Sequence, residues 1–144
     1  MLYFDACYIL KCYLNEPGAE KVRRLAREAG ALASCVHGRA EFWSGIARHE
    51  REGRLSRRTA RDILRQLRED ESNDVWHWLP LDRQLVELTC TLLEQHGRAL
   101  PLRTGDALHL ACAREHGFPA IHSSDRVILG AAKAFGLTGV NVLE

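Results

Sequence analysis

The chain has 144 residues, of which 46% are hydrophobic and 27% are charged, which suits one domain, residues 1–144, with an ordinary core. Its formal net charge of +1 argues against a molecule that binds polyanions over its whole surface, so such binding needs a local patch. No apolar run approaches the ~18 residues of a membrane span and no signal peptide is recognisable, so we expect a cytoplasmic protein without membrane contact.

The first half of the chain alternates brief apolar runs with segments of helical periodicity. Strands are expected at the brief runs, over Leu2–Phe4, Ala31–Ala33 and Val75–Leu79. Helices are expected between them, at Cys7–Leu14, at Ala19–Glu28, at Cys35–Arg51 with Ser34 as a cap, and after Ser56.

The second half continues the alternation. Helices are expected at Leu85–His96 after an Asp82 cap, from Thr104 or Gly105 through His116, and at Arg126–Phe135. Short strands are expected at Ala120–His122 and Gly139–Val142. Because strands separated by helices pair in parallel through right-handed crossovers, the predicted fold class is α/β: a three-layer α/β/α sandwich with a short, mainly parallel sheet of about five strands.

Four acidic residues stand near the expected strand ends and helix starts: Asp5, Glu41, Asp106 and Asp125. Each also has an ordinary explanation, as a helix cap, a first-turn carboxylate or a solvated surface side chain. Asp125 becomes free for a ligand if Ser123 or Ser124 caps the helix instead. Since strand ends of a parallel sheet share one edge, we expect the four acids to share a cleft.

Four converging carboxylates repel one another unless a cation lies among them. Hard oxygen ligands without paired His or Cys favour Mg²⁺ or Mn²⁺ over zinc. The glycines near Glu41, Gly38 and Gly45, cost ~1 kcal/mol each inside a helix, which indicates that something approaches closely there.

Three histidines are placed near this expected cleft. His109 lies three residues after Asp106, His37 lies four residues before Glu41, and His122 lies beside a strand end. Each either contacts the site or is a packed core histidine. No histidine is required as a base in the metal-assisted chemistry.

The five cysteines form no CxxC pair and are odd in number, so a zinc site or a disulfide framework is not expected. Cys35, Cys90 and Cys112 stand among apolar residues and are predicted to be small core residues. Cys7 differs because it follows the acid at the end of the first strand.

The sequence resembles the PIN domain family, and within it the VapC-type toxin ribonucleases. The resemblance covers nearly the whole chain. The stretches that carry it are Tyr3-Phe4-Asp5-Ala6-Cys7-Tyr8-Ile9-Leu10-Lys11, Asn15-Glu16-Pro17-Gly18, Arg39-Ala40-Glu41, Arg103-Thr104-Gly105-Asp106-Ala107-Leu108-His109-Leu110-Ala111, Ser123-Ser124-Asp125-Arg126 and Ala131-Ala132-Lys133-Ala134-Phe135-Gly136-Leu137.

The resemblance implies that the four acids bind one or two Mg²⁺ or Mn²⁺ ions and that Ser123 supports the site. It implies endonucleolytic cleavage of RNA by a metal-activated water, and a toxin role in a type II toxin–antitoxin pair. It also implies two partners, a cognate antitoxin and a second copy in a homodimer. The chain departs from the family at Ala6-Cys7, where Thr or Ser and then Ser or Asn are usual.

Positive charge for an RNA substrate is available in two places. Arg39, Arg103 and Arg126 lie close in sequence to the acids and are the expected contacts near the metal. Residues 48–68 carry eight arginines against three acids, which indicates either a phosphate-contacting surface or a solvated helix pair.

Three other functions are alternatives to a nuclease. A haloacid-dehalogenase phosphatase needs a second Asp where this chain has Cys7, and a response-regulator receiver needs an acidic pair and a late Lys that the chain lacks. A catalytically weak or inactive PIN-like module that binds RNA or protein stays open because of Ala6-Cys7.

Overall fold

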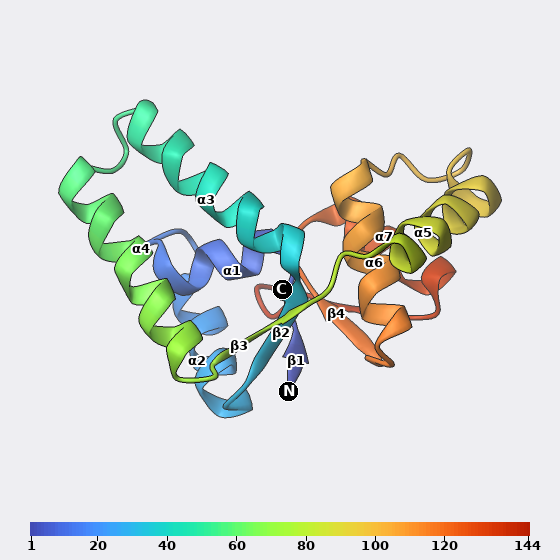
Figure 1. The fold of residues 1–144 in the computed structure, drawn as a ribbon, viewed down its shortest axis with the longest axis horizontal. Helices are drawn as coiled ribbons and strands as arrows, with labels where there is room; N and C mark the ends of the chain where they lie inside the picture. The colour runs from blue at the N-terminus through green and yellow to red at the C-terminus, as the bar shows by residue number, and fades with distance from the viewer.

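The computed structural model describes all residues from 1 to 144, as parallel strands flanked by helices (Figure 1). The strands are β1 (Leu2–Tyr3), β2 (Leu32–Cys35), β3 (Trp76–Leu79), β4 (Ala120–His122) and β5 (Thr138–Val140). The helices are α1 (Ala6–Tyr13), α2 (Ala19–Ala29), α3 (Val36–Arg51), α4 (Arg57–Ser72), α5 (Arg83–His96), α6 (Thr104–Glu115) and α7 (Arg126–Ala131), followed by a 3-10 turn at Ala132–Phe135.

All strand pairs are parallel. Strands β1, β2 and β3 form one group and β4 and β5 form another. A parallel bridge between Phe4 and His122 joins the groups, and the backbone N–H of Asp5 donates to the carbonyl of His122 over 3.2 Å. The resulting order is β3-β2-β1-β4-β5, so the direction of winding reverses between β1 and β4, where open α/β sheets hold ligands.

Two hydrophobic clusters cover the two faces of this sheet. Side chains of successive strand residues point to opposite faces, so Tyr3 belongs to one cluster and Phe4 to the other. The Tyr3 cluster includes Leu85 of α5 and Leu110 of α6, and the Phe4 cluster includes residues of α1 to α4. Figure 1 shows α1–α4 on one side of the strands and α5–α7 on the other. The predicted three-layer α/β/α fold is thereby confirmed.

The helix and strand boundaries agree with expectation to within a few residues, with local corrections. Ser34 lies inside β2 rather than capping α3, and its buried hydroxyl has no hydrogen-bond partner. The last helix ends at Ala131 and tightens into the 3-10 turn, and the last strand begins at Thr138 and ends two residues early. Cys90 is exposed and was wrongly assigned to the core, whereas Cys35 and Cys112 are buried.

None of the helices combines the length and apolar character that a bilayer crossing requires.

Candidate metal-binding active site

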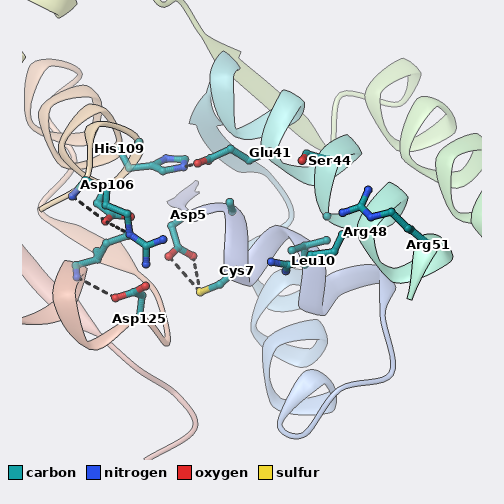
Figure 2. A pocket seen from close by; sticks show the side chains of 15 residues that line it. Asp5, Cys7, Leu10, Glu41, Ser44, Arg48, Arg51, Asp106, His109 and Asp125 are labelled. Carbon is teal, nitrogen blue, oxygen red and sulfur yellow. Dashed lines mark hydrogen bonds and ion pairs between the residues drawn. The ribbon is translucent and has the colours of Figure 1, made fainter. Parts of the chain in front are cut away.

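The four acids line one cleft of about 500 Å³ beside the β1/β4 reversal (Figure 2). Asp5 and Asp125 come directly before α1 and α7, Asp106 lies in the first turn of α6, and Glu41 lies within α3. Chain segments more than 100 residues apart are therefore brought to one hollow by the topology of the sheet.

Asp5 is the buried centre of this arrangement, with only 2% of its surface exposed. Its Oδ1 accepts the backbone N–H of Tyr8 over 3.0 Å, so Asp5 is the N-cap of α1. Its Oδ2 accepts the hydroxyl of Ser123 over 2.5 Å, the supporting contact expected of that serine. Burial raises the pKa of Asp5 above its ordinary 3.8, although the hydrogen bonds it accepts lower it again in part.

Cys7 supplies a donor that the sequence comparison did not anticipate. Its Sγ lies 2.9 Å and 3.1 Å from the two oxygens of Asp5 and 3.3 Å from the hydroxyl of Ser124. The thiol therefore gives Asp5 a donor, weaker than a hydroxyl or an amide, at the position where Ser or Asn was expected from the family resemblance. Burial, and next the negative charge of Asp5, raises the pKa of Cys7 to about 12, so the thiol keeps its proton.

Asp106 and Asp125 each use one carboxylate oxygen to order the chain and leave the other without a hydrogen bond. Oδ2 of Asp106 accepts the backbone N–H of Arg103 over 3.2 Å. Oδ1 of Asp125 accepts the N–H groups of Val127 and Ile128, so of the two alternatives left open by the sequence it is Asp125, not a serine, that caps α7. Burial, opposed by the Arg103 N–H and reinforced by the charge of Asp125, raises the pKa of Asp106.

Glu41 enters the cleft from α3 and is held by a histidine. Its Oε2 lies 2.8 Å from Nε2 of His109 and 3.6 Å from Nε2 of His37. Burial opposes ionisation of Glu41, but the hydrogen bond with His109 holds its pKa below the ordinary 4.5. Gly105 leaves room for it, because a Cβ there would lie 2.7 Å from Oε1.

The histidines divide into two groups. His109 and His37 both contact the site through Glu41, and together the three side chains offer ligand atoms within 4.8 Å of one another. Nε2 of His109 and Nε2 of His37 already have partners. The first contacts Glu41, and the second also lies 3.2 Å from the carbonyl of Gly105. His122 is buried and does not line the cleft, and its Nδ1 lies 3.1 Å from the carbonyl of Tyr3.

The acids fit a hard divalent cation. Glu41, Asp106 and Asp125 each keep one carboxylate oxygen that accepts no hydrogen bond, and Figure 2 shows Asp5, Asp106 and Asp125 turned toward a common space. Burial raises the pKa values of Asp5 and Asp106, so their ionised forms are disfavoured unless positive charge compensates them. A cation held by oxygen ligands supplies that charge.

Three arginines line the cleft: Arg48, Arg51 and Arg103. Arg103 directly precedes α6, and its place in the cleft was expected. Arg48 and Arg51 come from the last turn of α3, and the sequence indicated them only as part of the arginine-rich segment 48–68. Arg126 is exposed and does not line the cleft. Arg39 forms an ion pair with Glu71, 2.5 Å apart, and also lies outside it.

The family model described as PIN domain matches residues 2–134. The fold is similar to the crystal structure of FitAcB from Neisseria gonorrhoeae, with 17% identity, 98% of this chain and 97% of that chain covered, and a TM-score of 0.68. It is also similar to VapBC2 from Rickettsia felis bound to a DNA fragment from its promoter, with 15% identity, 98% of both chains covered and a TM-score of 0.66. A search of curated protein sequences gave no significant match.

Proposed function

The chain belongs to the PIN domain family, and from that premise we propose that it is a Mg²⁺- or Mn²⁺-dependent endoribonuclease. The observation that carries the proposal is the single cleft in which Asp5, Glu41, Asp106 and Asp125 meet. Burial raises the pKa of two of these carboxylates, Asp5 and Asp106, so a cation would stabilise their charged forms.

The four acids are proposed to hold the ion, and Ser123 and Cys7 to keep Asp5 oriented toward it. When bound, the ion supplies Lewis acidity and a water of lowered pKa. Without that positive charge, the carboxylates repel a phosphodiester.

The arginines are proposed to hold the RNA backbone on both sides of the acids. Arg103 lines the cleft from the start of α6. Arg48 and Arg51 line it from α3 (Figure 2). A strand that passes through the cleft therefore meets positive charge before and after the acids. Sequence-independent phosphate contacts of this kind fix the position of the substrate.

We further propose a toxin role in a type II toxin–antitoxin pair, with a cognate antitoxin as partner and a homodimer as the assembled form. Support for the role comes from the family and from similarity over nearly the whole chain to FitAcB and VapBC2. The alternative of a weak or inactive PIN-like module was tied to Ala6-Cys7. The position of the Cys7 thiol against Asp5 weakens that argument, since a donor is present.

The test is cleavage of an end-labelled RNA pool by the purified chain with Mn²⁺, Mg²⁺ or EDTA. We expect cleavage with either metal, none with EDTA, and a loss of roughly 100-fold or more in Asp106→Asn. Asp82→Asn is the matched control, because Asp82, like Asp106, stands at the start of a helix but lies outside the cleft. Cleavage that persists in EDTA or in Asp106→Asn would contradict the proposal.

A further inference from the structure

The ring of His109 connects the protein core to the cleft. His109 comes from α6 and is only 2% exposed. Its Nε2 lies 2.8 Å from Oε2 of Glu41, and its Nδ1 lies 3.0 Å from the hydroxyl of Tyr3 in β1. Figure 2 shows the imidazole directed at the carboxylate. One buried ring thus touches both the sheet and a proposed metal ligand.

The hydrogen bonds of Tyr3 determine which ring nitrogen of His109 carries the proton. The hydroxyl oxygen of Tyr3 accepts the backbone N–H of Cys35 over 3.0 Å, and the side chain is fully buried. Its own hydrogen needs an acceptor, and Nδ1 of His109 is a far better one than the neighbouring sulfur of Cys112. With Nδ1 accepting, the ring proton resides on Nε2, which donates to Glu41.

Two glycines allow the histidine and the glutamate to approach each other. A Cβ at Gly38 would lie 2.9 Å from Cε1 of His109, and a Cβ at Gly105 would lie 2.7 Å from Oε1 of Glu41. The ring of His37 packs beside that of His109, with centroids 4.2 Å apart. The pair is therefore enclosed by packing that any larger residue at either glycine would disturb.

We propose that His109 is a positioning residue, which aims the carboxylate of Glu41 at the metal, and that Tyr3 fixes the ring in the tautomer that donates to Glu41. The inference rests on the proposed metal-dependent function. Neither side chain needs to touch RNA or the ion. The side chain of Glu41 is 39% exposed at the edge of the cleft, so without this bond it is free to turn toward water. Partners of this kind typically change metal affinity by about 10–100-fold when removed.

The test is calorimetric titration of Mn²⁺ into the full chain and into His109→Leu and His109→Gln. His109→Leu keeps an apolar volume but loses the donor, and we expect its Mn²⁺ affinity to fall about 10–100-fold. His109→Gln places an amide N–H near the position of Nε2, and most of the affinity should return. Melting curves of both variants report whether they fold. Equal affinity in His109→Leu, or no recovery in His109→Gln, would overturn the proposal.

A second readout examines the tautomer without metal. Long-range ¹H–¹⁵N spectra of the labelled chain should show His109 with its proton on Nε2, and Tyr3→Phe should release the ring to a mixture of tautomers. A proton on Nδ1 in the unmodified chain contradicts the inferred direction. If the unmodified chain binds no Mn²⁺, the proposed function fails as well. If it binds Mn²⁺ as tightly as His109→Leu does, the positioning role alone fails.

Discussion

The carboxylate of Asp5 is buried among donors, yet burial keeps its pKa above the ordinary 3.8. The folded chain therefore holds the Asp5 proton more tightly than the unfolded chain does. The resulting stability is present below the unfolded pKa and is lost as the pH rises through the folded pKa, so at neutral pH the ionised group is a penalty.

Asp5→Asn should remove that penalty while keeping a good helix cap. In EDTA at pH 7 we expect its Tm to rise by about 2–4 °C, the shift that roughly 1 kcal/mol gives in a domain of this size. The difference from the parent chain should shrink as the pH falls through the raised pKa of Asp5 toward 3.8, where the carboxyl is protonated in both the folded and the unfolded chain. Thermal melts across that range measure it, and a variant that is less stable at pH 7 would refute this account of Asp5.

Cys7 should be a poor nucleophile despite its place in the cleft. Burial and the charge of Asp5 raise its pKa to about 12, so almost no thiolate exists at pH 7.5. Iodoacetamide should label Cys7 at least ~10-fold more slowly than the exposed Cys90. Peptide mass spectrometry measures the two labelling rates. Asp5→Asn should speed the labelling of Cys7 and leave that of Cys90 unchanged. Equal rates for the two cysteines would show that the thiol is not shielded in this way.

Helix α3 carries a glycine that its contacts explain. A Cβ at Gly38 would lie 2.8 Å from Oγ of Ser34 and 2.9 Å from the His109 ring, and both neighbours are buried. Gly38→Ala gains about 1 kcal/mol of helix propensity but incurs an overpacking cost of about 1–3 kcal/mol. We therefore expect a net loss of about 1 kcal/mol in the free energy of unfolding, measured with urea.

Gly130 in α7 is the matched control for that change, because a Cβ there meets nothing within 4 Å. Gly130→Ala should raise the free energy of unfolding by roughly 0.5–1 kcal/mol. If Gly38→Ala stabilises the chain as much as Gly130→Ala does, then α3 and α6 are not packed as closely as described.

The elements themselves were largely readable from the sequence, because apolar periodicity and capping residues are local signals. Ser56 and Asp82 were identified as caps, and each accepts the expected backbone N–H. Ser34 was misjudged because a buried strand residue and a helix cap look alike when only neighbours in sequence are considered. Cys90 was misjudged because its apolar neighbours in α5 face the core while the cysteine itself faces outward.

Part of the site was predictable because strand ends and helix starts are local signals in the sequence. Strand ends and helix starts pointed to Asp5, Asp106 and Asp125, since parallel topology gathers them at one edge. The Tyr3–His109–Glu41 contacts join residues as many as 106 positions apart, and no local pattern signals them. Likewise, the choice of Arg48 and Arg51 over Arg126 depends on where the end of α3 lies in space.

For the molecule as a whole, positive charge at the cleft should govern RNA binding. Arg48→Ala together with Arg51→Ala should weaken binding across all RNA sequences and reduce the slope of log K against log salt by about 1–2. Arg57→Ala with Arg58→Ala, on exposed positions at the start of α4 outside the cleft, is the control and should change the slope less. Fluorescence anisotropy in metal-free buffer measures both. An equal effect of the two pairs would indicate a diffuse basic surface.

The central claim is that Asp5, Glu41, Asp106 and Asp125 form one divalent-metal site, and thermal melts with and without millimolar Mn²⁺ test it most directly. A ligand that binds only the folded state adds about 2.7 kcal/mol to the free energy of unfolding when its concentration is 100 times the Kd. The Tm rises as a result. We predict such a rise for the parent chain and for Asp82→Asn. We predict a much smaller rise for each of Asp5→Asn, Glu41→Gln, Asp106→Asn and Asp125→Asn. An unchanged Tm in the parent chain, or an equal rise in all four variants, would contradict the account.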